Sequence, residues 1–257
     1  MYASFTEPRL VPEASPDLLP RADSPYWLFY EQVAVAQLAA WLPAAPCLVL
    51  ELSCGPVDRR ALLVAAGHVV LQVRAEVDPA EPPPVPGAHR LLADSHDLRW
   101  LQDASVDAIV VESQVLSRCL ATEVMADHLA RVLRPGGRVL LIVESLLLGL
   151  ARLADQGRWA ELADIPAADC VLVPGEDGTI TRCFWPQELR GLLTGAGLEV
   201  DWVRPRSVLS VSAVERAIAS EGAQTTMALV KAELALAQEH EGESTGLHLI
   251  ASAVRPV

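Results

Sequence analysis

Three glutamates stand at the ends of apolar segments, where a carboxylate could bind a cation or exchange a proton. Glu51 lies in CLVLEL, Glu112 closes DAIVVE, and Glu144 closes RVLLIVE. Short apolar runs of this kind predict buried strands, and ligands of an open parallel sheet bind beyond the carboxyl ends of its strands. We expect Glu51 at a binding site, with capping of the next loop as the alternative. Glu112 and Glu144 are the best acidic candidates for contact with a molecule that reacts at this site.

Polar residues also follow two other expected strands. Arg74 follows the segment from His68, and we interpret it as a surface ion-pair partner rather than a ligand residue. Asp94 follows the next short strand and is expected to contact a ligand, whereas Asp97 is interpreted as a helix cap. Among the six histidines, His96 is the one that we expect near this site.

Composition and charge exclude several classes of function. The formal net charge is −13, which argues against sequence-independent binding of nucleic acid or of an anionic membrane. The five cysteines include no C-x-x-C pair and the histidines no H-x-H spacing, so we expect neither a disulfide framework nor a metal site. The N-terminal residues do not resemble a signal peptide, and the longest apolar run is too short to cross a bilayer. We expect a cytoplasmic protein with a small-molecule substrate.

A helix is predicted over residues 24–42, because Ser24 is a good N-cap and proline follows it at the first helical position. The start of this helix is aromatic. Trp27 and Phe29 are expected to pack in the core. Tyr26 and Tyr30 share a helix face and are expected to line a substrate pocket.

Strands and helices alternate along the rest of the chain, which predicts a mostly parallel α/β sheet covered on both faces. A helix is expected to begin at Pro56. A long helical insert is expected from about Val208 to Glu241, with a break at Gly222 and an apolar stripe of Met227, Val230, Leu234 and Ala237. The predicted organisation is a single domain. It comprises an N-terminal arm and cap helix (1–46), a core (47–204), a helical insert (205–245) and a last strand (246–257).

Five segments in order resemble the class I S-adenosylmethionine-dependent methyltransferases, from about Leu48 to Val203. They are ELSCGPV, LLADSHDL, SVDAIVVESQVL, HLARVLRPGGRVLL and FWPQELRGLLTGAGLEV. The resemblance implies a Rossmann-like, mostly parallel seven-stranded sheet with helices on both faces, an N-terminal helical cap and a late helical insert. It also implies S-adenosyl-L-methionine as cofactor and methylation of an oxygen, nitrogen or carbon atom of a small molecule.

The same resemblance assigns site residues. In it Glu51 takes the ammonium group of the cofactor, and Asp94 meets the adenine. The expected cofactor-binding residues are Glu51, Ser53, Cys54, Gly55, Arg74, Asp94, Ser95, Glu112 and Ser113. The expected substrate residues are Tyr26, Tyr30 and Glu144, and the candidate catalytic residues are His96, Glu112 and Glu144.

Departures from the family pattern leave a second hypothesis open. Of three glycine positions in the loop only Gly55 stands, with Ser53 and Val57 at the others, and Arg74 replaces the usual acid for the ribose. The alternative is an inactive methyltransferase-like protein that serves as a partner or scaffold subunit, as a homodimer or with a related methyltransferase. A nicotinamide-dependent oxidoreductase is disfavoured, because there is no G-x-G-x-x-G loop and no tyrosine paired with Lys231, the only lysine.

Overall fold

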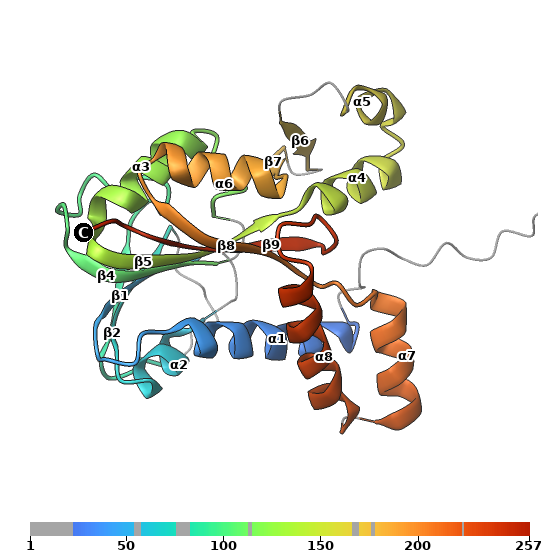
Figure 1. Ribbon diagram of the computed structural model, residues 1–257, viewed down its shortest axis with the longest axis horizontal. Coiled ribbons are helices and arrows are strands. Elements are labelled where there is room, and N and C mark those ends of the chain that lie inside the picture. The colour runs from blue at the N-terminus through green and yellow to red at the C-terminus, as the bar shows by residue number, and fades with distance from the viewer. Residues whose placement is uncertain are drawn as a thin grey trace, which may run out of the picture.

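The computed structural model describes residues 23–53, 58–75, 83–112, 115–165, 170–175, 178–222 and 224–257. A mixed, mostly parallel sheet of seven strands forms its centre (Figure 1). In spatial order the strands are β3 (Ala88–Leu92), β2 (Val69–Arg74), β1 (Leu48–Leu52), β4 (Val106–Val111), β5 (Leu133–Glu144), β9 (His248–Val254) and β8 (Glu199–Arg206). Only β9 runs antiparallel to its neighbours, β5 and β8. The predicted Rossmann-like α/β sheet is confirmed.

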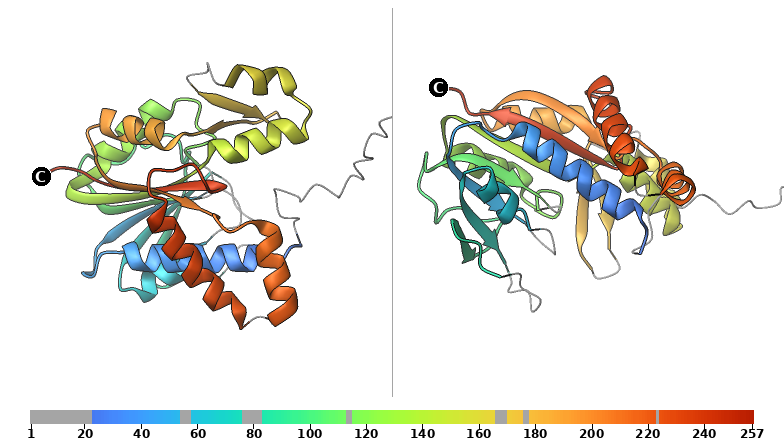
Figure 2. Two further views of the ribbon diagram at one scale, coloured as in Figure 1. Left: turned by 45° about the vertical axis from the view of Figure 1, so that its right-hand side comes forward. Right: turned by 90° about the horizontal axis from the view of Figure 1, so that it is seen from below.

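Helices cover both faces of the sheet, as expected (Figures 1 and 2). One face carries α1 (Tyr26–Trp41), α2 (Arg60–Ala65), α7 (Val211–Glu221) and α8 (Thr225–Glu239). The other carries α3 (Thr122–Val132) and α6 (Pro186–Gly195). The strands are apolar toward both layers, because helices exclude water from each face.

The N-terminal helix differs from its prediction in which aromatic residues it buries. Tyr26 is fully buried with Phe29 in a cluster between α1, α7 and α8, whereas Trp27 is 40% exposed. The expected pairing of Tyr26 with Tyr30 in a pocket is therefore corrected. Tyr26 packs in the core because the predicted insert folds back as α7 and α8 over that face of α1. Of the two tyrosines, Tyr30 is the one that is partly exposed.

The predicted insert consists of two helices that meet at Gly222, which caps α7 with a φ of 78°. Ser210 is the N-cap of α7, and its side chain accepts a hydrogen bond from the amide of Ala213. Val230 and Ala237 of the expected apolar stripe are buried, but Met227 is 69% exposed. The first residue of the stripe, at the start of α8, therefore faces solvent.

Two features were not anticipated. Between β5 and α6 the chain forms α4 (Leu146–Asp155), α5 (Trp159–Asp164) and a hairpin of β6 (Val171–Pro174) and β7 (Ile180–Cys183), which stand apart from the main sheet in Figure 1. The helix predicted from Pro56 begins instead at Arg60, and Pro56 itself lies outside the described residues.

Candidate functional site

A line of polar side chains crosses the sheet at the carboxyl ends of its parallel strands, on the face that α1 covers. On β1 and β5 an apolar residue on this face precedes the carboxylate by two positions, as in Val49 before Glu51 and Ile142 before Glu144. Because side chains alternate between faces, these polar residues stay on the side of α1. We call the line the polar row; it consists of Gln72, Glu51, Glu112, Glu144, His248 and Arg206.

Arg59 joins two members of the polar row to α1. Its side chain is almost completely buried, and its Nε lies 3.4 Å from Glu112 Oε1. Its guanidinium also pairs with Glu31 of α1, with 3.1 Å between Nη2 and Oε2. The main-chain amide of Arg59 donates to Glu51 Oε1 at 3.1 Å. One residue therefore contacts all three carboxyl groups at this end of the row.

Glu51 is fully buried in the middle of this network. Besides the amide of Arg59, it accepts a hydrogen bond from Gln72 Nε2 at 3.1 Å, and Gln72 in turn accepts one from Arg90 at 2.8 Å. Burial raises the pKa of Glu51 to about 7, although the hydrogen bond from the Arg59 amide opposes this shift. The side chain is thus poised to change charge near neutral pH.

The opposite end of the row is basic. Arg206, at the end of β8, is 1% exposed and donates from Nε to Gln37 Oε1 at 2.6 Å. Its Nη1 lies 3.5 Å from the Tyr30 hydroxyl, and that hydroxyl lies 3.4 Å from His248 Nδ1. Burial, and then the nearby guanidinium of Arg206, lower the pKa of His248 to about 3, so this imidazole is neutral at pH 7.

Glu144 lies between the two ends. Its carboxylate is fully buried and pairs with Arg152 of α4, while its Oε1 has no hydrogen-bond partner among the described residues. Burial raises its pKa, and the charge of Arg152 opposes that shift. The unanticipated helix α4 therefore supplies the counter-ion of a residue that was expected at the site.

The predicted site residues separate into three groups. Glu51, Glu112, Glu144 and Tyr30 are brought together along the polar row. Arg74 ends β2 on the same face and is 6% exposed, so its interpretation as a surface residue is wrong. The reason is that helices cover this face of the sheet, and α2 packs against β2. Cys54, Gly55 and Ser113 lie outside the described residues.

The third group follows β3. Asp94 Oδ1 accepts a hydrogen bond from the amide of His96 at 2.9 Å, and Asp97 accepts one from Arg99 in the same way. Both aspartates thus form local turns, and no helix starts at Asp97. Ser95 is buried beside them. Within the described part of the chain, the hydrogen bonds of Asp94 and His96 connect them with each other and with Val115, not with the polar row.

Sequence reasoning missed five residues of the site, namely Glu31, Arg59, Gln72, Arg206 and His248. The expectation that His96 is the only histidine near the site is wrong, because His248 lies directly between Glu144 and Arg206 in the register of β5, β9 and β8. The alternation of side chains along β8 and β9 could have placed His248 and Arg206 on this face of the sheet. That inference also requires that β9 runs antiparallel, because only then does its first residue lie beside the carboxyl ends of the parallel strands.

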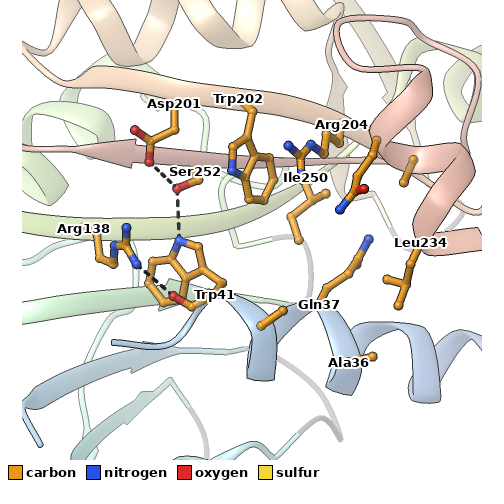
Figure 3. A pocket seen from close by; sticks show the side chains of 13 residues that line it. Ala36, Gln37, Trp41, Arg138, Asp201, Trp202, Arg204, Leu234, Ile250 and Ser252 are labelled. Atoms are coloured by element: carbon orange, nitrogen blue, oxygen red, sulfur yellow. Dashed lines mark hydrogen bonds between the residues drawn. The ribbon is translucent and has the colours of Figure 1, made fainter. Parts of the chain in front are cut away.

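A separate cavity of about 490 Å³ lies on the same face of the sheet, between α1, α8 and the strands β8 and β9 (Figure 3). The indoles of Trp41 and Trp202 and the side chains of Arg138 and Arg204 line it. Gln37 also lines it and accepts the hydrogen bond from Arg206, so this one side chain stands between the cavity and the polar row. The sequence-predicted site residues do not line this cavity.

The described residues contain no group of three or more histidine, cysteine, aspartate or glutamate side chains that could hold a metal ion. They also contain no helix whose length and apolar character would let it cross a bilayer.

Several solved structures with a similar fold are methyltransferases. The chain is similar to the Burkholderia thailandensis 1,6-didemethyltoxoflavin-N1-methyltransferase with bound 1,6-didemethyltoxoflavin and S-adenosylhomocysteine, at 15% identity over 91% of this chain and 82% of that one, with a TM-score of 0.54. It is also similar to an S-adenosylmethionine-dependent methyltransferase from Mesorhizobium loti, at 16% identity over 87% and 98% of the two chains, with a TM-score of 0.55.

A third similar structure is the complex between the Haloferax volcanii Trm112 methyltransferase activator and a methyltransferase candidate. There the identity is 16% over 90% of this chain and 91% of that one, and the TM-score is 0.56. No protein-family model and no curated protein sequence matches the chain. These likenesses show that the chain has the fold of class I S-adenosylmethionine-dependent methyltransferases.

Proposed function

We propose that this protein is an S-adenosylmethionine-dependent methyltransferase that acts on a small-molecule acceptor. The observation that carries the proposal is the acidic end of the polar row. The guanidinium of Arg59 pairs with Glu31 and Glu112, and its main-chain amide donates to Glu51, so three carboxyl groups cluster around this residue. Such a cluster of carboxyl groups suits a ligand that carries positive charge, as the ammonium and sulfonium groups of this cofactor do.

The residues at the end of β1 fit the same ligand. Ser53 is 1% exposed, and its hydroxyl has no hydrogen-bond partner in the described part of the chain. A buried hydroxyl without a partner costs free energy, which a bound polar group would recover. In the proposal Glu51 and Glu112 hold the ammonium group, and Ser53 contacts the amino-acid portion.

The bound cofactor would supply a methyl group on a sulfonium, which is already activated for displacement. The protein then has to align the acceptor and exclude water, a contribution of about 7–11 kcal/mol for well-oriented partners. Helix α1 would do both, because it covers the polar row and brings Tyr30 and Glu31 to it.

Four described cysteines with free thiols support a cytoplasmic location.

Calorimetric titration with S-adenosylhomocysteine tests the proposal. We expect saturable binding by the wild-type protein and affinity about tenfold lower for E112Q, because a charge-assisted contact is worth about 1.5–3 kcal/mol. E161Q is the matched control, since Glu161 lies on the exposed helix α5 and pairs only with Arg158 among the described residues. Absence of binding at millimolar S-adenosylhomocysteine would contradict the catalytic proposal.

One observation favours a second candidate function. Arg59 already neutralises Glu112 and Glu31, so the protein's own cation occupies part of the acidic end. In this alternative the chain is an inactive partner subunit, either as a homodimer or with a related methyltransferase. It predicts no cofactor binding by the isolated chain and a stoichiometric complex on purification from the native host. Mass spectrometry and light scattering of the purified protein would distinguish the two functions.

A further inference from the structure

Arg206 is a buried cation for which the described residues provide no counter-ion. Within the described residues its hydrogen-bond partners are the amide oxygen of Gln37 and the hydroxyl of Tyr30, which are both neutral, and its Nη2 has no partner. Removing a guanidinium from water is costly unless a negative charge compensates it. The neighbouring basic residue, Arg204, shows the ordinary arrangement, because it is partly exposed and pairs with Glu241 at 3.1 Å.

The main chain at Arg206 is held in place from several sides. Ser207 adopts a φ of 70°, a left-handed conformation that residues other than glycine seldom adopt. Glu233 of α8 is fully buried and accepts hydrogen bonds from the amides of Val208 and Leu209, at 2.8 and 2.9 Å. Such strain persists where the surroundings enforce it, and it concentrates at ligand sites.

The contacts in front of Arg206 are longer than ordinary hydrogen bonds. The bonds from Arg206 Nη1 to Tyr30 and from Tyr30 to His248 measure 3.5 and 3.4 Å, beyond the usual 2.7–3.2 Å. Tyr30 and His248 are both partly exposed. An oxygen anion that entered between these three side chains would form shorter hydrogen bonds than those it displaced.

The charges divide the polar row into two ends. Carboxyl groups cluster at the end with Glu51 and Glu112, and Glu144 pairs with Arg152. The end at Arg206 has a positive charge without a counter-ion among the described residues, beside the neutral ring of His248. The acidic end is the one proposed above for the cofactor. The basic end is left for the molecule that receives the methyl group.

We propose that the methyl acceptor is a carboxylic acid whose carboxylate is bound by Arg206 with Tyr30 and His248. This inference rests on the proposed function for the role of the bound acid as acceptor, whereas the anion site itself can be measured independently. The planar guanidinium matches a carboxylate in a bidentate geometry, which also orients the rest of the acceptor toward the middle of the row.

Titration calorimetry with two matched pairs of probes tests this inference. The pairs are benzoate with benzamide and acetate with acetamide, because each amide has the shape of its acid but no charge. We expect the wild-type protein to bind at least one carboxylate saturably at millimolar concentration. Its affinity for the matching amide should be lower by about tenfold or more. Binding of neither carboxylate, or equal binding of acid and amide, overturns the proposal.

Variants locate the site. R206Q should reduce carboxylate affinity about tenfold or more, while its unfolding midpoint stays equal or rises, because an uncompensated buried charge is removed. R204Q is the control on the same strand and face, and it should bind as the wild type does. R206K, which keeps the charge but not the planar fork, should bind with intermediate affinity even if R206Q folds poorly. Wild-type affinity in R206Q and R206K overturns the assignment.

S-adenosylhomocysteine is titrated into the same proteins. If it binds and the carboxylates do not, the proposed function stands and the acceptor inference fails. If the carboxylates bind through Arg206 and S-adenosylhomocysteine does not, the anion site stands and the methyltransferase proposal fails.

Discussion

Gly246 packs directly against the main chain of Arg206. A Cβ atom at Gly246 would lie 2.9 Å from both the nitrogen and the carbonyl carbon of Arg206, and closer still to its oxygen. The carbonyl of Gly246 is in turn fixed by the hydroxyl of Ser145, at 2.6 Å. Gly246 thus links Ser145, which follows β5, to the main chain of Arg206 at the basic end of the polar row.

The first prediction follows from this contact. G246A should destabilise the protein by about 1–3 kcal/mol, because the added methyl group meets main-chain atoms that cannot rotate away. Urea unfolding measures the change. G191A is the control with the opposite expected sign, because Gly191 lies within α6 with nothing near its Cβ position, and alanine favours a helix. Equal stability of G246A and the wild type would contradict the close packing.

The second prediction concerns the ion pair of Arg59 and Glu112. R59M should cost about 3–5 kcal/mol, because it leaves the buried carboxylate of Glu112 without its cation. Denaturant unfolding measures this cost. R158M provides the comparison, since the Arg158–Glu161 pair is half-exposed and should contribute at most about 1 kcal/mol.

A double variant separates the ion pair from packing. If charge burial causes the loss, R59M combined with E112Q should recover part of the stability that R59M alone loses. Strictly additive effects of the two substitutions would show that Arg59 contributes by packing alone.

The third prediction is the pH dependence that Glu51 confers. Its pKa in the folded protein is about 7, above the ordinary value of 4.5, so the folded state binds this proton more tightly than the unfolded state. The resulting stability is present below pH 4.5 and is lost as the pH rises to 7, by up to about 3 kcal/mol. Unfolding free energies measured across this range should fall less steeply in E51Q. An unchanged slope in E51Q would assign the effect to another group.

The fourth prediction has the opposite sign. The pKa of His248 is lowered from 6.5 to about 3, so the stability that it confers is present above pH 6.5 and is lost as the pH falls toward 3. H248Q should therefore weaken the loss of stability on acidification. H240Q is the control, because His240 lies in an exposed turn after α8. Identical acid profiles of H248Q and the wild type would refute the assignment.

The fifth prediction concerns the wall of the cavity in Figure 3. Trp41 Nε1 donates to the buried hydroxyl of Ser252 at 3.0 Å, and that hydroxyl donates to Asp201 at 2.8 Å. S252A should cost about 1–3 kcal/mol, because the indole N–H loses its acceptor. Thermal unfolding measures the change, with S220A on the exposed side of α7 as the control. A loss no greater than that of S220A would indicate that water replaces the hydroxyl.

The sequence predicted the central sheet well because local patterns determine it. Apolar runs, the glycines after helices and the proline at Pro186 locate most strands and helices within a few residues. The region of α4, α5 and the β6–β7 hairpin escaped prediction, since its apolar run continues that of β5 without an intervening turn signal. The hydroxyl of Ser145, which caps α4 by accepting from Leu148, is the local signal that was overlooked.

Sequence reasoning named the three glutamates of the polar row and Tyr30, but not Arg206 and His248. Glu51, Glu112 and Glu144 follow strands whose direction the sequence makes plain. Arg206 and His248 become neighbours only through the antiparallel pairing of β8 and β9, which no local pattern specifies. Arg59 escaped because its contacts with Glu31 and Glu112 depend on how α1 packs on the sheet, which no local pattern specifies.

The pairing of Arg206 with His248 also bears on how this protein could change its substrate. The chain between these two residues forms α7 and α8, yet the strand register alone sets their separation. The entropy of chain closure depends only weakly on length, so these helices could be lengthened or shortened provided that Glu233 and the core shared with α1 are kept. A descendant of this protein could thereby acquire a differently shaped acceptor chamber while inheriting the strand ends unaltered.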